Sequence, residues 1–135
     1  MKFRHLATLS AFLFWALAVV WMFAPAQMLA NWGVGFSNET GLVSRRAAAL
    51  YMGFGVMFFL ARNAAPSVIR SALVSGFVTA CLILAALGVF EWTSGHASSG
   101  ILAAVLVEVL LSLAFVFVQR RDQECVLNRG SEPAR

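Results

Sequence analysis

The segment ILAAVLVEVLLSLAFVFV (residues 101–118) carries a single charged side chain, Glu108, in an otherwise almost entirely apolar run. An α-helix rises about 1.5 Å per residue, and the hydrocarbon core of a bilayer is about 30 Å thick. Eighteen residues are therefore enough to cross that core as a helix. The segment predicts a membrane-spanning helix with an acid inside it.

Three more apolar segments precede this one, at residues 6–24, 47–61 and 71–90. The first and third are long enough to cross a bilayer without help. The second is short, and it can span only if the arginines at its two ends extend along the helix to the lipid headgroups. Linkers rich in glycine, proline and small polar residues separate the segments at residues 31–41, 63–67 and 91–100. These features predict four membrane spans.

The composition of the whole chain also favours a membrane environment. Of its 135 residues, 61% are hydrophobic and 12% are charged, whereas a soluble domain has about 45–50% apolar and about 25% charged residues. We therefore predict an all-α fold, with one four-transmembrane-helix bundle at residues 1–124 and a polar, disordered C-terminal tail at residues 125–135. Pro25 and the residues after it are expected to form a short amphipathic segment at the membrane interface.

The distribution of basic residues predicts an orientation. The net charge of +4 comes from side chains that flank apolar segments, so it indicates topology and no nucleic-acid partner. Only Arg45 and Arg46 fall on one side of the membrane. The other eight share the opposite side: Lys2, Arg4, Arg62, Arg70, Arg120, Arg121, Arg129 and Arg135. The positive-inside rule places both termini in the cytoplasm. Residues 24–26 (Ala-Pro-Ala) also resemble a signal-peptide cleavage site, but the apolar run before them is long for a signal.

Small residues predict where the helices approach one another. Ala72, Gly76 and Ala80 form a row at helical spacing, and Gly53 and Gly55 lie in the second span. In lipid, such residues allow close contact between helix backbones. The hydroxyl side chains of a second face are expected to hydrogen-bond across the bundle: Ser71, Ser75 and Thr79.

Glu108 is the main candidate for a functional residue, because a charge within a span is energetically costly. It lies about 10 Å below the start of its helix, on a face expected to point into the bundle: Ile101, Ala104, Glu108, Ser112, Phe115 and Gln119. Arg45 or Arg46 could reach it from the outer end, and Tyr51 lies at a similar depth with a hydroxyl group. Two interpretations stay open. Either these side chains form a polar ligand-binding pocket, or the arginines only contact headgroups and Glu108 is a hydrogen-bonded core acid.

The remaining reactive side chains do not suggest catalysis. Cys81 and Cys125 lie in different environments and are expected to be unpaired. His5 and His96 are expected on opposite sides of the membrane, so they cannot ligate one haem. We therefore expect no catalytic residue, no metal site and no cofactor, and we favour a protein that is not an enzyme.

Ser44-Arg45, Gly53-Phe54-Gly55 and Ala61-Arg62 form a spaced pattern in the second span, and Phe-Ala-Pro-Ala follows the first span at residues 23–26. The pattern resembles small four-helix bacterial membrane proteins that are loosely DoxX-like. The resemblance implies a four-helix bundle in a bacterial inner membrane, and the DoxX-like group includes a subunit associated with quinone-linked oxidation. Arg46 and Glu108 are not part of this pattern.

These observations lead to one main expectation and two alternatives. The main one is a protein that binds a lipid, a quinone or another amphipathic ligand in an outward-facing pocket, or that serves as an accessory subunit of a membrane complex. Its partners would then be membrane lipids and either a second copy or another membrane protein. The alternatives are a small proton-coupled exporter that uses Glu108 and a non-catalytic subunit of a quinone-linked redox complex.

Overall fold

The structure, a computed structural model, describes the backbone of residues 3–130 and the side chains of residues 3–121. This part of the chain is helical, with no strand, and its helices are α1 (Phe3–Phe23), α2 (Pro25–Asn31), α3 (Asn38–Ala61), α4 (Val68–Thr93) and α5 (Ile101–Gly130). Four of them, α1, α3, α4 and the Ile101–Arg121 part of α5, are long and apolar enough to cross a membrane. The prediction of four helical spans is confirmed.

The helix boundaries lie within three residues of the apolar segments for α1 and α4 and differ most at the start of α3 and at the end of α5. α3 begins at Asn38, inside the expected linker, because Ser37 and Thr40 form a capping box. The Ser37 hydroxyl accepts from the Thr40 backbone N–H at 3.2 Å, and the Ser37 N–H donates to Thr40 Oγ1 at 2.8 Å. α5 continues to Gly130, so residues 125–130 of the expected disordered tail are helical. Residues 131–135 lie outside the described part of the chain.

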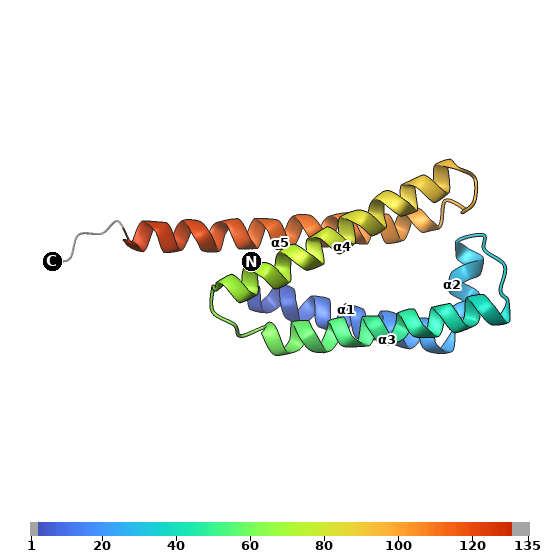
Figure 1. Ribbon diagram of the computed structural model, residues 1–135, viewed down its shortest axis with the longest axis horizontal. Coiled ribbons are helices and arrows are strands. Elements are labelled where there is room, and N and C mark those ends of the chain that lie inside the picture. The colour runs from blue at the N-terminus through green and yellow to red at the C-terminus, as the bar shows by residue number, and fades with distance from the viewer. Residues whose placement is uncertain (1–2, 131–135) are drawn as a thin grey trace.

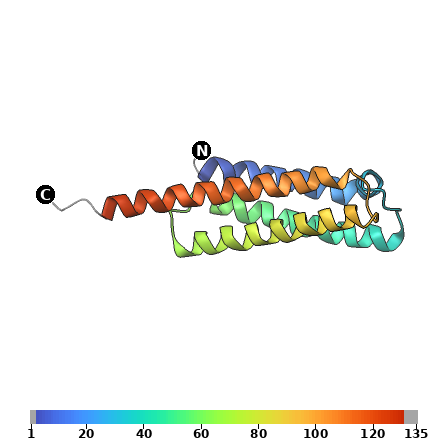
Figure 2. The ribbon, with the colours of Figure 1, turned by 90° about the horizontal axis from the view of Figure 1, so that it is seen from above.

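The four long helices form two pairs. In the first pair α1 packs along α3, and in the second pair α4 packs along α5 (Figure 1). Contacts between the pairs are fewer and run mainly from α1 to α5. The short helix α2 lies across one end of the first pair, and the view from above shows the long helices running roughly along one direction (Figure 2).

Two glycines permit the close packing within the pairs. A Cβ atom on Gly55 would overlap the Trp15 indole of α1, and one on Gly88 would lie 2.6 Å from Val105 Cγ2 of α5. The prediction was therefore right for Gly55. It was wrong for Gly53 and Gly76, where a Cβ would meet nothing within 4 Å. Periodic spacing alone does not reveal which side of a helix faces a neighbour.

Four buried phenylalanines, one from each spanning helix, join the two pairs. Phe58 of α3 has its ring centroid 4.7 Å from that of Phe77 in α4 and 5.0 Å from that of Phe115 in α5. Phe14 of α1 meets Phe77 edge-on at 5.6 Å and stacks with Phe58 at 6.0 Å. We call these four side chains the aromatic cluster. They are at most 6% exposed, and edge-on and offset pairs of this kind add to the stability that burial provides.

Polar contacts hold the helices together beyond the aromatic cluster, toward the start of α4. Gln119 Nε2 of α5 donates to Ser71 Oγ of α4 at 2.5 Å. The guanidinium of Arg70 lies 4.3 Å from the ring centroid of Phe3 in α1. Of the hydroxyl face expected to bond across the bundle, Ser71 does so, whereas the Thr79 hydroxyl donates to the Ser75 carbonyl of its own helix at 2.9 Å.

A matched pair of glycine variants tests the packing of the first pair. Gly55→Ala is expected to lower the free energy of unfolding by about 1–3 kcal/mol, because the added methyl group must displace Trp15. Gly53→Ala, two residues away in open surroundings, is expected to leave stability unchanged or to raise it slightly through helix propensity. Unfolding in a mixed-detergent titration measures both. Equal stability of the two variants would contradict the contact between Gly55 and Trp15.

Candidate functional site

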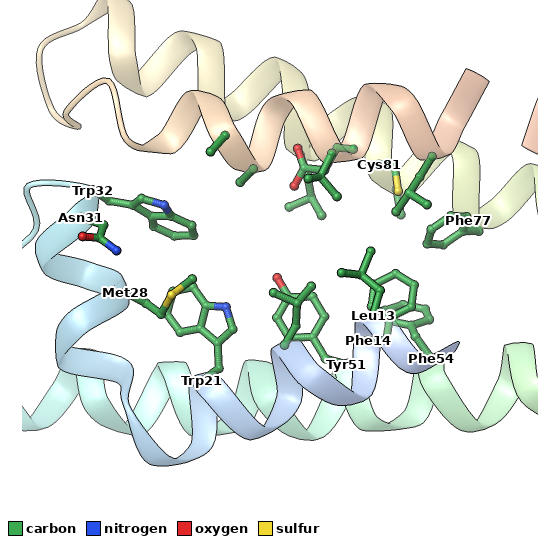
Figure 3. Close-up of a pocket in the computed structure, with 18 of the residues that line it drawn as sticks. Leu13, Phe14, Trp21, Met28, Asn31, Trp32, Tyr51, Phe54, Phe77 and Cys81 are labelled. Atoms are coloured by element: carbon green, nitrogen blue, oxygen red, sulfur yellow. The ribbon is translucent and has the colours of Figure 1, made fainter. Parts of the chain in front are cut away.

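A cavity of about 320 Å³ lies between the first and second helix pairs. Figure 3 shows side chains of the first pair and of α2 facing side chains of the second pair across it. Its volume is within the range of small-molecule binding sites, about 300–1,000 Å³. Its lining is mostly apolar, with side chains from all five helices.

The floor of the cavity is the aromatic cluster. Phe14 and Phe77 of that cluster line the cavity together with Phe54. The Tyr51 ring stacks on Phe14 with centroids 6.0 Å apart and an interplanar angle of 16°. This stacking fixes the phenol ring, whose hydroxyl end points toward the second pair (Figure 3). The aromatic contacts that hold the bundle together therefore also orient a polar group in the cavity.

At the other end of the cavity, residues 31–33 at the end of α2 meet residues 98–100 before α5, and we call these two segments the end cap. Ser98 Oγ donates to the Asn31 carbonyl at 2.7 Å, and the Ser98 backbone N–H donates to the Trp32 carbonyl at 2.7 Å. A Cβ on Gly100 would overlap the Asn31 carbonyl oxygen. Gly33 has a positive φ of 74°, a conformation that favours glycine. The ring centroids of Trp32 and Trp21 lie 5.0 Å apart, so aromatic side chains also line this end of the cavity.

Glu108 of α5 and Tyr51 of α3 both line the cavity, as the sequence predicted for side chains at similar depth. They lie close enough to interact electrostatically. Neither side chain has a hydrogen-bond partner within residues 3–121. Glu108 comes from the face expected to point inward, and that expectation is confirmed: Ala104 and Glu108 line the cavity, Ser112 and Phe115 are buried, and Gln119 bonds to α4.

Arg45 and Arg46 lie elsewhere. Both side chains are exposed, and neither lines the cavity. A Cβ on Gly41 would lie 3.9 Å from Arg45 Nη1, so the Arg45 side chain runs back along α3 toward its N-terminus. The structure thus brings Tyr51 and Glu108 together but not the arginines that were expected to approach them.

The spacing of side chains along α3 distinguishes Tyr51, which faces the cavity, from Arg45 and Arg46, which do not. Its inward face is marked by small and aromatic residues at alternating intervals of four and three: Ser44, Ala48, Tyr51, Gly55 and Phe58. Arg45 and Arg46 fall about 100° and 200° away from Ser44 on the helix. The same reasoning applied to α4 would have found Cys81, which continues the buried face of Val74 and Phe77.

Sequence analysis missed several cavity residues. Cys81 is a buried free thiol, as expected, but it also lines the cavity. Trp32 also faces the cavity, beside Trp21. His96 is exposed and pairs with Glu91 through Nδ1 and Oε2 at 3.0 Å. In the described part of the chain, no three His, Cys, Asp or Glu side chains gather closely enough to hold a metal ion.

Substitution of Gly100 tests the end cap. Gly100→Ala is expected to lower the free energy of unfolding by about 1–3 kcal/mol, because its methyl group overlaps a backbone carbonyl that cannot rotate away. It should also speed hydrogen exchange at the Ser98 amide. Gly35→Ala is the control, since a Cβ there meets nothing within 4 Å. If Gly100→Ala matches Gly35→Ala in stability and in exchange, the end cap does not close the cavity as described.

Comparison of the chain with models of protein families, with curated proteins and with solved structures gives no match. The DoxX-like resemblance of the second span therefore stays a prediction. The functional assignment depends on the cavity, its aromatic walls and the two polar groups that face it.

Proposed function

We propose that this integral membrane protein binds a small amphipathic molecule, such as a lipid or a quinone, in the cavity between its helix pairs. The observation that carries the proposal is the pairing of a ligand-sized, largely apolar cavity with two polar groups that have no hydrogen-bond partner among residues 3–121, the Tyr51 hydroxyl and the Glu108 carboxyl. Rings and chains of a ligand would contact Phe14, Phe54 and Phe77, while its polar part would bind the two polar groups.

The ligand is proposed to enter from the lipid rather than from water. Leu84 of α4 and Val107 of α5 line the cavity, yet they are 47% and 39% exposed, which supports an opening at the surface of the second pair. The end cap closes the route along the bundle axis through the contacts of Ser98 and Gly100 with Asn31. A ligand that partitions into the bilayer would therefore reach the cavity sideways.

We propose a bacterial inner membrane and an orientation with both termini in the cytoplasm, so that the end cap faces outward. The asymmetry of basic residues supports the orientation, and the DoxX-like resemblance supports the bacterial inner membrane. Arg45 and Arg46 would then be the outer basic residues and would bind phosphate groups of lipids outside the cavity. An accessory role in a larger membrane complex, including a quinone-linked one, is compatible with the same cavity.

A second candidate function is proton-coupled export. It is favoured by Glu108, because a membrane carboxyl that faces a ligand cavity can exchange a proton for a substrate. Transport assays in proteoliposomes separate the two functions. Export predicts that a substrate gradient drives protons across the proteoliposome membrane and that Glu108→Gln abolishes this movement, whereas a binding protein takes up its ligand without carrying protons across the membrane.

Filling the cavity tests the binding function. Ala104 lines the cavity, so Ala104→Phe is expected to remove ligand binding by occupying the space. Ala72→Phe is the control, because Ala72 is exposed on α4 and lies outside the cavity. Native mass spectrometry of gently extracted protein should show a bound amphipathic molecule on wild type and Ala72→Phe and none on Ala104→Phe. Equal occupancy of all three proteins would count against the cavity as the binding site.

A further inference from the structure

The side chains that line the cavity include an acidic group but no basic one. Among the side chains that line it, Glu108 is the only one of Asp, Glu, Lys, Arg or His type. The other titratable side chains that line it, Tyr51 and Cys81, are neutral when protonated. The arginines expected to neutralise Glu108 are exposed outside the cavity. The protein as described therefore places a carboxyl group in an apolar space and provides no cation to balance it.

The aromatic walls of the cavity also favour a positive charge. Six aromatic side chains line it: Phe14, Trp21, Trp32, Tyr51, Phe54 and Phe77. The face of an aromatic ring carries a partial negative charge and attracts cations, and tryptophan does so most strongly. Phe14 stacks beside Tyr51, and Trp32 packs against Trp21, so aromatic side chains are distributed from the floor of the cavity to the end cap.

An anionic ligand would find little to bind it there. Its charge would lie near the Glu108 carboxyl and beside aromatic faces, and both repel an anion. The hydrogen-bond donors that face the cavity, among them the Tyr51 hydroxyl and the Asn31 amide, could serve a neutral ligand. A ligand that balances Glu108, however, must carry positive charge.

We propose that the cavity selects a lipophilic cation, an amine or quaternary ammonium attached to an apolar or aromatic body, with Glu108 as its counter-charge and the aromatic walls as its cage. This inference rests on the proposed ligand-binding function and narrows its ligand class. The apolar body would lie against the aromatic cluster. The cationic group would lie between Glu108 and the rings that line the cavity.

Three probes of matched shape test the charge preference. They are (2-naphthylmethyl)trimethylammonium, its uncharged carbon isostere 2-neopentylnaphthalene, and the anion 2-naphthylmethanesulfonate. Binding to wild type in phosphatidylcholine nanodiscs is measured by equilibrium dialysis against empty nanodiscs, which subtracts partition into lipid. The cation is expected to bind about tenfold or more tightly than its isostere, since a desolvated cation among aromatic rings gains that much affinity.

Glu108→Gln removes the charge and keeps the shape of the side chain. It is expected to reduce the affinity for the cation about tenfold or more and to leave the affinity for the neutral isostere unchanged. Binding of the neutral isostere also shows that this variant is folded. Tyr51→Phe keeps the aromatic ring and is expected to keep the preference for the cation.

The outcomes separate the two proposals. If wild type binds the isostere or the sulfonate as tightly as the cation, or if Glu108→Gln binds the cation as wild type does, the cation preference is wrong. In that case, loss of isostere binding in Ala104→Phe would still support ligand binding in the cavity. If wild type binds none of the probes more than Ala104→Phe does, the cation preference is refuted, and the binding function is then judged separately by the native mass spectrometry of wild type and Ala104→Phe.

Discussion

The aromatic cluster is the contact on which the rest of this bundle depends. Phe14, Phe58, Phe77 and Phe115 come from four different helices, and their rings meet within 4.7–6.0 Å. In lipid, helices gain no hydrophobic energy by leaving the bilayer for one another, so close packing must hold them together. Packing between the pairs continues from the aromatic cluster toward the start of α1, where Phe3 contacts Phe115 of α5 and Arg70 of α4. The cavity lies between the pairs on the other side of the cluster, toward the loop that precedes α5.

The cavity is preserved because both of its ends are held. The aromatic cluster forms the floor, and hydrogen bonds from Ser98 to the end of α2 hold the end cap. Within the pairs, Gly55 and Gly88 let the helices approach closely. The aromatic side chains of these helices lie between the pairs, where several of them line the cavity. Glu108 and Tyr51 are then placed in this space by the helices that carry them. A stable core and a polar site are thus built from the same few contacts.

The inward position of Glu108 was predictable from sequence. Within residues 101–119 the face that carries Ala104, Glu108, Ser112 and Phe115 recurs at intervals of three and four, and in the structure this face points inward. The start of α3 was predicted too late, at residue 47, because hydropathy identifies only the apolar part of a helix. The helix begins earlier, at Asn38, because Ser37 and Thr40 form a capping box there. An arginine was expected near Glu108 because reach along the helix was considered without direction around it. Arg45 and Arg46 are exposed outside the cavity, and the Arg45 side chain runs back along α3 toward its N-terminus.

The sequence by itself determined the number of spans, the all-helical class and the inward face of α5, because each follows from apolar length and from helical periodicity. Only the tertiary structure decided which helices pair, which glycines are contacts and which side chains share the cavity. Gly53 and Gly55 are equivalent as sequence, and Arg45 and Tyr51 were both candidates to meet Glu108, the first by reaching down from the outer end and the second by lying at a similar depth. What separates them is the rotation of α3 against α1 and α4, which depends on side chains far apart in the chain that meet only in the folded bundle.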